Sequence, residues 1–140
     1  PQPADKSESD GNGKSDLFLA SMMENLKNPY DSVAVDDLRR TLDAAERPFL
    51  VDIRPRELFD QSHIPGSVNI PMEDIPERSG DFPDDRQAPI VMVCGIGKFS
   101  KQWTLFLKSM GYRNVRSLKG GINEWVRKSG PTQTSTARRN

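Results

Sequence analysis

The sequence predicts an α/β fold built on a parallel sheet, because short apolar runs alternate along the chain with segments of helical periodicity. Two of these runs, Phe49–Ile53 and Ile90–Val93, are nearly continuous in apolar residues, as buried parallel strands are. Between Ser100 and Met110, apolar side chains recur at the i, i+3, i+4 and i+7 spacing of a helix that buries one face. The pattern indicates a central parallel five-stranded sheet with helices on both faces.

The elements follow one another between residues 32 and 130, which we interpret as one domain. The expected strands lie around Val33 and Val35, at Phe49–Ile53, at Ser67–Ile70, at Ile90–Val93 and at Val115–Leu118. The expected helical segments are Val35–Ala45, a turn that begins at Pro71, Ser100–Met110 and Gly121–Lys128. Gly111 follows one helix and Gly130-Pro131 closes the last, as helix stop signals do.

The two ends of the chain differ from this middle part. Residues 1–16 combine Pro, Gly, Ser, Asn and charged residues with almost nothing to bury, so we expect a disordered tail. Residues 17–31 begin with helix-spaced apolar side chains and are expected to pack on the domain or to dock on a partner or fused domain. Residues 131–140 are expected to form a C-terminal tail.

Composition excludes several classes of function. The chain has 20 basic and 20 acidic residues and a formal net charge of zero, which argues against nucleic-acid and membrane partners. It has no apolar stretch of transmembrane length. Its single cysteine cannot form an internal disulfide, and this favours a reducing compartment, the cytoplasm. We expect neither a metal site nor a cofactor.

That cysteine, Cys94, follows the apolar run Ile90–Val93 and opens the loop Gly95–Phe99, and a helical pattern starts at Ser100. The two loop glycines allow backbone amides to turn inward around the sulfur, and a helix N-terminus adds a positive end. Both features favour the thiolate, which is the reactive form of cysteine. Lys98 is the one cation inside the loop. From the residues alone, Cys94 is either a nucleophile or a small buried hydrophobe at a strand end.

Arg54 follows the end of another expected strand, so it and Cys94 are predicted to face the same crevice at the carboxyl edge of the sheet. Arg54 either lines the pocket there or orients Asp52 or Glu57. Asp52 lies within an apolar strand, and we expect it to be a structural hydrogen-bonding group because a buried carboxylate needs partners.

Motifs on both sides of the loop agree, in order, with a known family. Val51–Arg54, Glu57, Phe59 and the run His63–Pro71 resemble the N-terminal motif of the rhodanese family of single-domain sulfurtransferases. Gly111-Tyr112, Val115, Leu118, Gly120-Gly121 and Trp125 resemble its closing segment. The resemblance implies a rhodanese-like fold for residues 32–130. It also places His63, the only histidine, in a structural turn instead of a cysteine–histidine pair.

The resemblance further implies a persulfide mechanism. Cys94 would take a sulfane sulfur from a small donor, thiosulfate or a persulfide, hold it as Cys94–S–SH and pass it to a thiol or protein acceptor. The residues expected to form the active-site loop and to bind the donor are Gly95, Ile96, Gly97, Lys98, Phe99 and Ser100, together with Arg54. The loop departs from the family in having no cation after Cys94 and Phe99 in place of the usual Arg, Thr or Ser. These departures favour a persulfide donor over dianionic thiosulfate.

Two other functions are compatible with a loop cysteine in such a fold. Related phosphatases and arsenate reductases use the pattern Cys-x5-Arg, but here the sixth residue after Cys94 is Ser100, and a lysine cannot replace the guanidinium fork. That class is therefore disfavoured. The second alternative is a non-catalytic rhodanese-like interaction or regulatory module, for which the atypical loop and a docking segment at residues 17–31 would be consistent.

Overall fold

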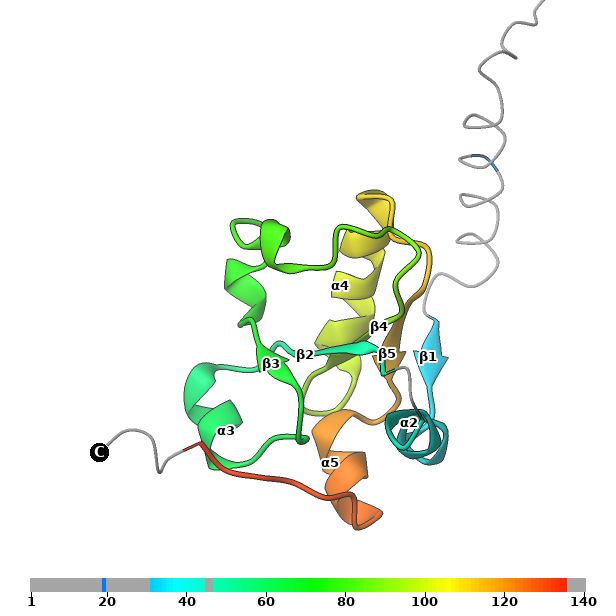
Figure 1. Cartoon of the computed structure of the whole chain (residues 1–140). Coiled ribbons are helices and arrows are strands. Elements are labelled where there is room, and N and C mark those ends of the chain that lie inside the picture. The colour runs from blue at the N-terminus through cyan, green and yellow to red at the C-terminus, as the bar shows by residue number, and fades with distance from the viewer. Residues whose placement is uncertain (1–18, 20–30, 45–46, 136–140) are drawn as a thin grey trace, which may run out of the picture.

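The computed structural model describes residue 19 and residues 31–44 and 47–135. The expected tail at residues 1–16 lies outside the described residues, as does nearly all of the expected helical segment at residues 17–31. The described part forms a five-stranded parallel sheet with strand order β1-β5-β4-β2-β3 (Figure 1). This confirms the predicted α/β fold. The strands are β1 (Ser32–Val33), β2 (Phe49–Asp52), β3 (Val68–Asn69), β4 (Ile90–Val93) and β5 (Val115–Leu118).

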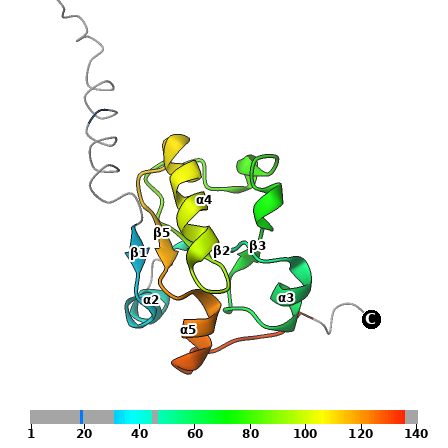
Figure 2. The same ribbon diagram turned by 180° about the vertical axis from the view of Figure 1, so that it is seen from behind.

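The sheet separates two apolar clusters, because successive side chains of a strand point to opposite faces. Along β4, Ile90 and Met92 belong to one cluster, and Val91 and Val93 belong to the other. Helix α4 packs on the first cluster and lies across the sheet in Figure 2, while α2 and α5 contribute to the second. The helical elements are α2 (Val35–Leu42), α3 (Arg56–Gln61), α4 (Lys98–Ser109), α5 (Gly121–Arg127) and the 3-10 turns η2 (Met72–Asp74) and η3 (Ser79–Asp81).

The boundaries of α2, α4 and α5 differ from the sequence prediction, α5 by ending at Arg127 instead of Lys128, and one helix was not predicted. Helix α4 begins at Lys98 instead of Ser100. Gly97 is its N-cap residue and has a left-handed φ of 88°, so the chain enters the helix directly after it. Helix α2 ends at Leu42 and not at Ala45. Helix α3 was not predicted at all, since it has six residues and buries only Phe59 and Asp60, too few to give a helical period.

The first five residues of the expected C-terminal tail lie against α3 (Figure 1, red). Gln133 and His63 form an antiparallel bridge in which each backbone N–H donates to the other's carbonyl at 2.9 Å. The indole Nε1–H of Trp125 donates to the Pro131 carbonyl at 2.8 Å. Residues 131–135 therefore connect the end of α5 to α3, and residues 136–140 lie outside the described part.

No helix in the described part of the chain is long and apolar enough to cross a membrane.

Candidate active site

The sulfur of Cys94 lies directly after β4 and is almost completely enclosed, since the residue is 4% exposed. The Gly97 N–H donates to Sγ at 3.0 Å and the Ser100 N–H at 3.4 Å. The thiol also contacts the Ser100 Oγ at 3.4 Å. An anion at so buried a position is costly unless donors surround it, and these groups are the donors that the structure provides.

Helix α4 contributes its N-terminal end to this arrangement. The first N–H groups of a helix have no partner within the helix, and the Ser100 N–H is one of them. No acidic side chain lies in the first turn of α4, and Gly97 makes no side-chain cap. The sulfur of Cys94 therefore occupies the place of a capping acceptor. Lys98 and Phe99, predicted as loop residues, belong to the first turn of the helix.

Helix α5 holds the cysteine loop by hydrogen bonds from its first N–H groups to the loop carbonyls. The Ile122 N–H donates to the Cys94 carbonyl at 2.8 Å, and the Asn123 N–H donates to the Gly95 carbonyl at 3.0 Å. This approach requires a glycine at position 121, where φ is +65° and a Cβ would lie 2.4 Å from the Cys94 carbonyl oxygen. In the sequence, Gly121 was only part of a family motif, and nothing local indicated that it touches the cysteine loop.

Two buried hydroxyl groups, those of Ser100 and Ser117, lie on the interior side of the Cys94 sulfur. Ser100 Oγ and Ser117 Oγ are 2.5 Å apart, and both residues are fully buried. Ser117 comes from β5, the strand next to β4. Sequence analysis did not single out Ser117. The strand reads Val-Arg-Ser-Leu, so Ser117 stands beside a second polar residue, Arg116, and no local signal distinguishes it.

Three exposed side chains belong to the cysteine loop and the first turn of α4. Ile96 is 63% exposed and Phe99 is 47% exposed, although both are large hydrophobic side chains. Lys98 lies between them in sequence and is also exposed. This segment therefore presents two apolar side chains and one ammonium group to solvent.

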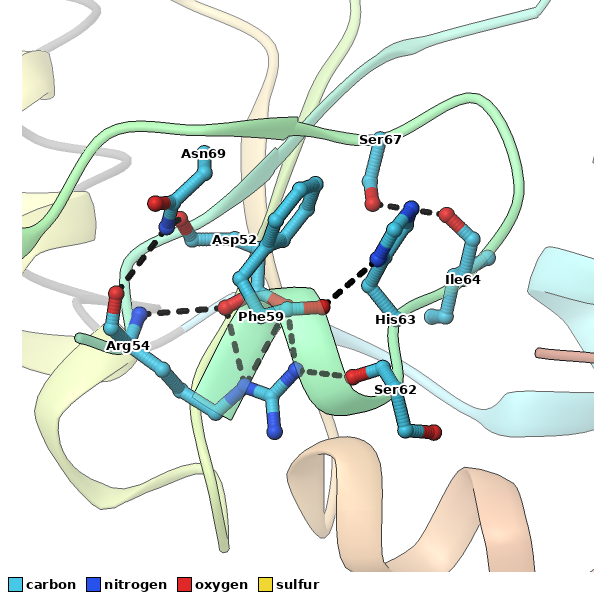
Figure 3. Close-up of polar contacts among 8 residues, drawn as sticks. All are labelled: Asp52, Arg54, Phe59, Ser62, His63, Ile64, Ser67 and Asn69. Atoms are coloured by element: carbon cyan, nitrogen blue, oxygen red, sulfur yellow. Dashed lines mark hydrogen bonds and ion pairs between the residues drawn. The ribbon is translucent and has the colours of Figure 1, made fainter. Parts of the chain in front are cut away.

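Arg54 and Asp52 form an ion pair at the end of β2, in which Asp52 is buried and Arg54 is partly buried (Figure 3). Asp52 is 1% exposed and accepts hydrogen bonds from the Arg54 backbone N–H at 3.0 Å, from Nε at 3.0 Å and from Nη2 at 2.8 Å. Arg54 Nη2 also donates to the Ser62 carbonyl at 2.6 Å. Of the roles considered for Arg54, orienting Asp52 is the one this geometry shows. A contact with substrate stays a prediction.

His63 occupies a structural position in the turn after α3 (Figure 3). Its Nδ1–H donates to the Phe59 carbonyl at 2.7 Å, and its ring stacks on the Phe59 ring with centroids 3.8 Å apart. Within the part of the chain that the structure describes, no hydrogen bond links His63 to Cys94. This agrees with the expectation that His63 does not pair with the cysteine.

A cavity of about 550 Å³ opens at the edge strand β3, away from the cysteine loop. Its lining includes Phe59, Val68, Asn69, Arg56 and Arg78, and it includes no residue of the loop 94–100. Among the described residues, no group of three or more His, Cys, Asp or Glu side chains could hold a metal ion.

These features define a class of protein: a parallel α/β domain with a buried cysteine whose sulfur accepts hydrogen bonds from backbone amides at a strand-to-helix turn. The model of the rhodanese-like domain family matches residues 34–128 of the chain. The chain belongs to the rhodanese-like domain family.

Several relatives carry names that indicate sulfur transfer. The chain is 37% identical over 100 residues to a sulfurtransferase of Allochromatium vinosum, and the match covers 71% of this chain and 89% of that protein. It is 34% identical over 116 residues to the adenylyltransferase and sulfurtransferase uba4 of Ogataea parapolymorpha, covering 82% of this chain but 28% of that protein. The chain thus spans about a quarter of the length of this longer relative.

Solved structures show the same fold. The Alr3790 protein of Anabaena sp. superposes with a TM-score of 0.67 at 26% identity, covering 76% of this chain and 86% of that one. A rhodanese-related protein of Thermoplasma volcanium superposes with the same TM-score of 0.67 at 24% identity, covering 74% of this chain and 98% of that one. The second likeness shows the fold alone.

Proposed function

We propose that residues 32–130 form a sulfurtransferase domain that carries a sulfane sulfur as a persulfide on Cys94. The observation that carries the proposal is the set of backbone donors on the sulfur, the N–H groups of Gly97 at 3.0 Å and Ser100 at 3.4 Å. Donors of this kind stabilise an anionic sulfur before and after it is loaded. The likeness to proteins named sulfurtransferase supports the same reaction class.

In the first half of the reaction, the Cys94 thiolate attacks the outer sulfur of the donor. A sulfur–sulfur bond forms on Cys94 while the donor's own bond to that sulfur breaks, and the electron pair leaves as sulfite or as a thiolate. In the second half, a nucleophilic acceptor attacks the outer sulfur and the Cys94 thiolate is the leaving group. Cys94 is therefore an anion at the start and at the end, next to the same donors.

Sulfur loading is tested by intact-mass spectrometry after incubation with thiosulfate or with a small-molecule persulfide. We expect the wild-type chain to gain one sulfur atom on Cys94 and the Cys94→Ser variant to gain none, because serine is a far weaker nucleophile towards sulfur. A Cys94→Ser variant that loads or transfers sulfur normally would refute the mechanism.

A wild-type chain that takes no sulfur from either donor would favour a second function, an interaction module that has the fold without the activity. The observation that favours this alternative is the exposure of Ile96 and Phe99 beside the cysteine, because exposed apolar side chains are frequent at binding surfaces.

Phe99 bears on the choice of donor. It occupies the first turn of α4 at the entrance to the site and offers no positive charge to dianionic thiosulfate. We expect Phe99→Arg to raise kcat/KM for thiosulfate by up to about fivefold, the effect of one partly exposed ion pair. Phe99→Gln, which is polar but uncharged, is the matched control and should give no such gain. Equal gains in both variants, or no gain in Phe99→Arg, would show that the missing cation does not limit the reaction.

The proposal extends to the sulfur acceptor and to the cellular compartment. The match to one part of a longer protein named adenylyltransferase and sulfurtransferase supports a thiol or protein acceptor, with residues 17–31 as a docking segment. A single cysteine that can form no internal disulfide supports a reducing compartment such as the cytoplasm.

A further inference from the structure

We infer that Ser117 is a positioning residue for Cys94, and that its hydroxyl acts through Ser100 to direct a hydrogen bond onto the thiolate. The inference deepens the proposed function, since it concerns the anion on which sulfur transfer would depend. It rests on two linked hydrogen bonds that connect Cys94 to Ser117 through Ser100. Cys94 Sγ lies 3.4 Å from Ser100 Oγ, which lies 2.5 Å from Ser117 Oγ.

The hydroxyl pair is enclosed by the fold. Ser100 and Ser117 are both fully buried, and they come from α4 and β5, which pack against each other. Buried hydroxyls are costly without partners, and here each supplies a partner to the other. The pair lies on the enclosed side of the sulfur, whereas Ile96 and Phe99 are on the exposed surface.

The direction of these hydrogen bonds depends on the state of the sulfur. In the thiol, the S–H donates to Ser100 Oγ. A thiolate can only accept, so the Ser100 O–H must then donate to the sulfur, which leaves Ser100 Oγ as an acceptor for the Ser117 O–H. The N–H donors of Gly97 and Ser100 cannot reverse in this way. The hydroxyl pair is thus the part of the site that responds to ionisation, and linked hydrogen bonds strengthen one another.

No charged side chain contacts Sγ directly among the described residues. The charged side chains on the elements that meet at the loop are Lys98, Lys101 and Lys108 of α4, Asp52 and Arg54 at the end of β2, Arg116 of β5, Lys119 after β5, and Glu124 and Arg127 of α5. Lys98, Lys101 and Lys119 are exposed, Lys108 is paired with Asp31, and Asp52 is paired with Arg54. The hydrogen bonds from Arg127 lower the pKa of Glu124, so its charge is constant at neutral pH. The inferred effect of Ser117 is therefore separable from these charges.

The test uses the rate at which iodoacetamide alkylates the protein as a function of pH, without any sulfur donor. Because the chain has one cysteine, this rate reports Cys94 alone. We expect Ser117→Ala to move the midpoint of the profile upward by about half a pH unit, which is about a threefold loss of thiolate below the midpoint. Ser100→Ala should shift it further, by about one unit. The double variant should match Ser100→Ala, because Ser117 acts through Ser100.

Two variants separate positioning from packing. Thr104→Val removes another buried hydroxyl of α4, one that donates to the Ser100 carbonyl and does not reach the sulfur, and it should leave the midpoint unchanged. Ser117→Thr keeps the hydroxyl and should retain the wild-type midpoint. If Ser117→Ala does not fold, Ser117→Val is a second hydroxyl-free variant with the same expected shift, and it has the shape of Ser117→Thr and suits a strand.

A wild-type profile in Ser117→Ala, or an equal shift in Thr104→Val, would overturn the inference. Since alkylation needs no sulfur transfer, this result is independent of whether the wild-type chain takes up sulfur.

Discussion

Replacing Gly121 with alanine is expected to displace the cysteine loop and to abolish sulfur loading on Cys94. The new Cβ would lie 2.4 Å from the Cys94 carbonyl oxygen and 2.5 Å from that of Gly95, and neither backbone atom can move without moving the loop. The residue also has a φ of +65°, which costs an alanine about 1–2 kcal/mol. Loss of the two hydrogen bonds from α5 to these carbonyls adds about 1 kcal/mol each.

The expected total for Gly121→Ala is a loss of ~3–4 kcal/mol in the free energy of unfolding, measured by urea denaturation. Sulfur loading is measured in parallel by intact mass, under conditions where the variant is folded. Gly80→Ala is the matched control, since a Cβ at Gly80 meets no atom within 4 Å, and it should change neither quantity. A Gly121→Ala variant that is as stable as wild type and loads sulfur normally would show that α5 does not hold the loop in place.

Replacing Arg54 with methionine is expected to destabilise the domain by ~3–5 kcal/mol, because it leaves the Asp52 carboxylate buried without its cation. Asp52 is 1% exposed and takes two side-chain donors of Arg54, Nε at 3.0 Å and Nη2 at 2.8 Å. A loss of this size is a large part of the stability of an ordinary domain, which is about 5–15 kcal/mol. Urea denaturation at neutral pH measures it.

Two further variants sharpen this test. Arg54→Met combined with Asp52→Asn removes both charges and should recover much of the lost stability, since the cost is that of an unpaired buried charge. Arg40→Ala removes the arginine of an exposed pair with Asp37 and should change stability by less than about 1 kcal/mol. An Arg54→Met variant that is as stable as Arg40→Ala but loads sulfur poorly would instead support a pocket role for Arg54.

The sheet could be predicted because its signals are local. The runs that became β2 and β4 are apolar enough to be buried from both sides, and the helical period of α4 spans three turns. Helix α3 could not be predicted in this way, because six residues give too short a period. The start of α4 was wrong by two residues, since Gly97 reads as a loop glycine in the sequence and acts as the residue before the helix in the structure.

The sequence by itself determined the family of the domain and the kind of turn that holds Cys94, because spaced motifs flank one cysteine, two glycines and a helix that follow one another along the chain. It made Cys94 the candidate nucleophile. Only the tertiary structure decided what surrounds the sulfur. Ser117 is 17 residues from Ser100 in the chain, and Gly121 is beyond it on the next helix, yet both meet the loop because parallel strands β4 and β5 are neighbours. No local pattern encodes that pairing. Parallel strands need a long crossover connection between them, so residues that lie side by side in the sheet are far apart in the sequence.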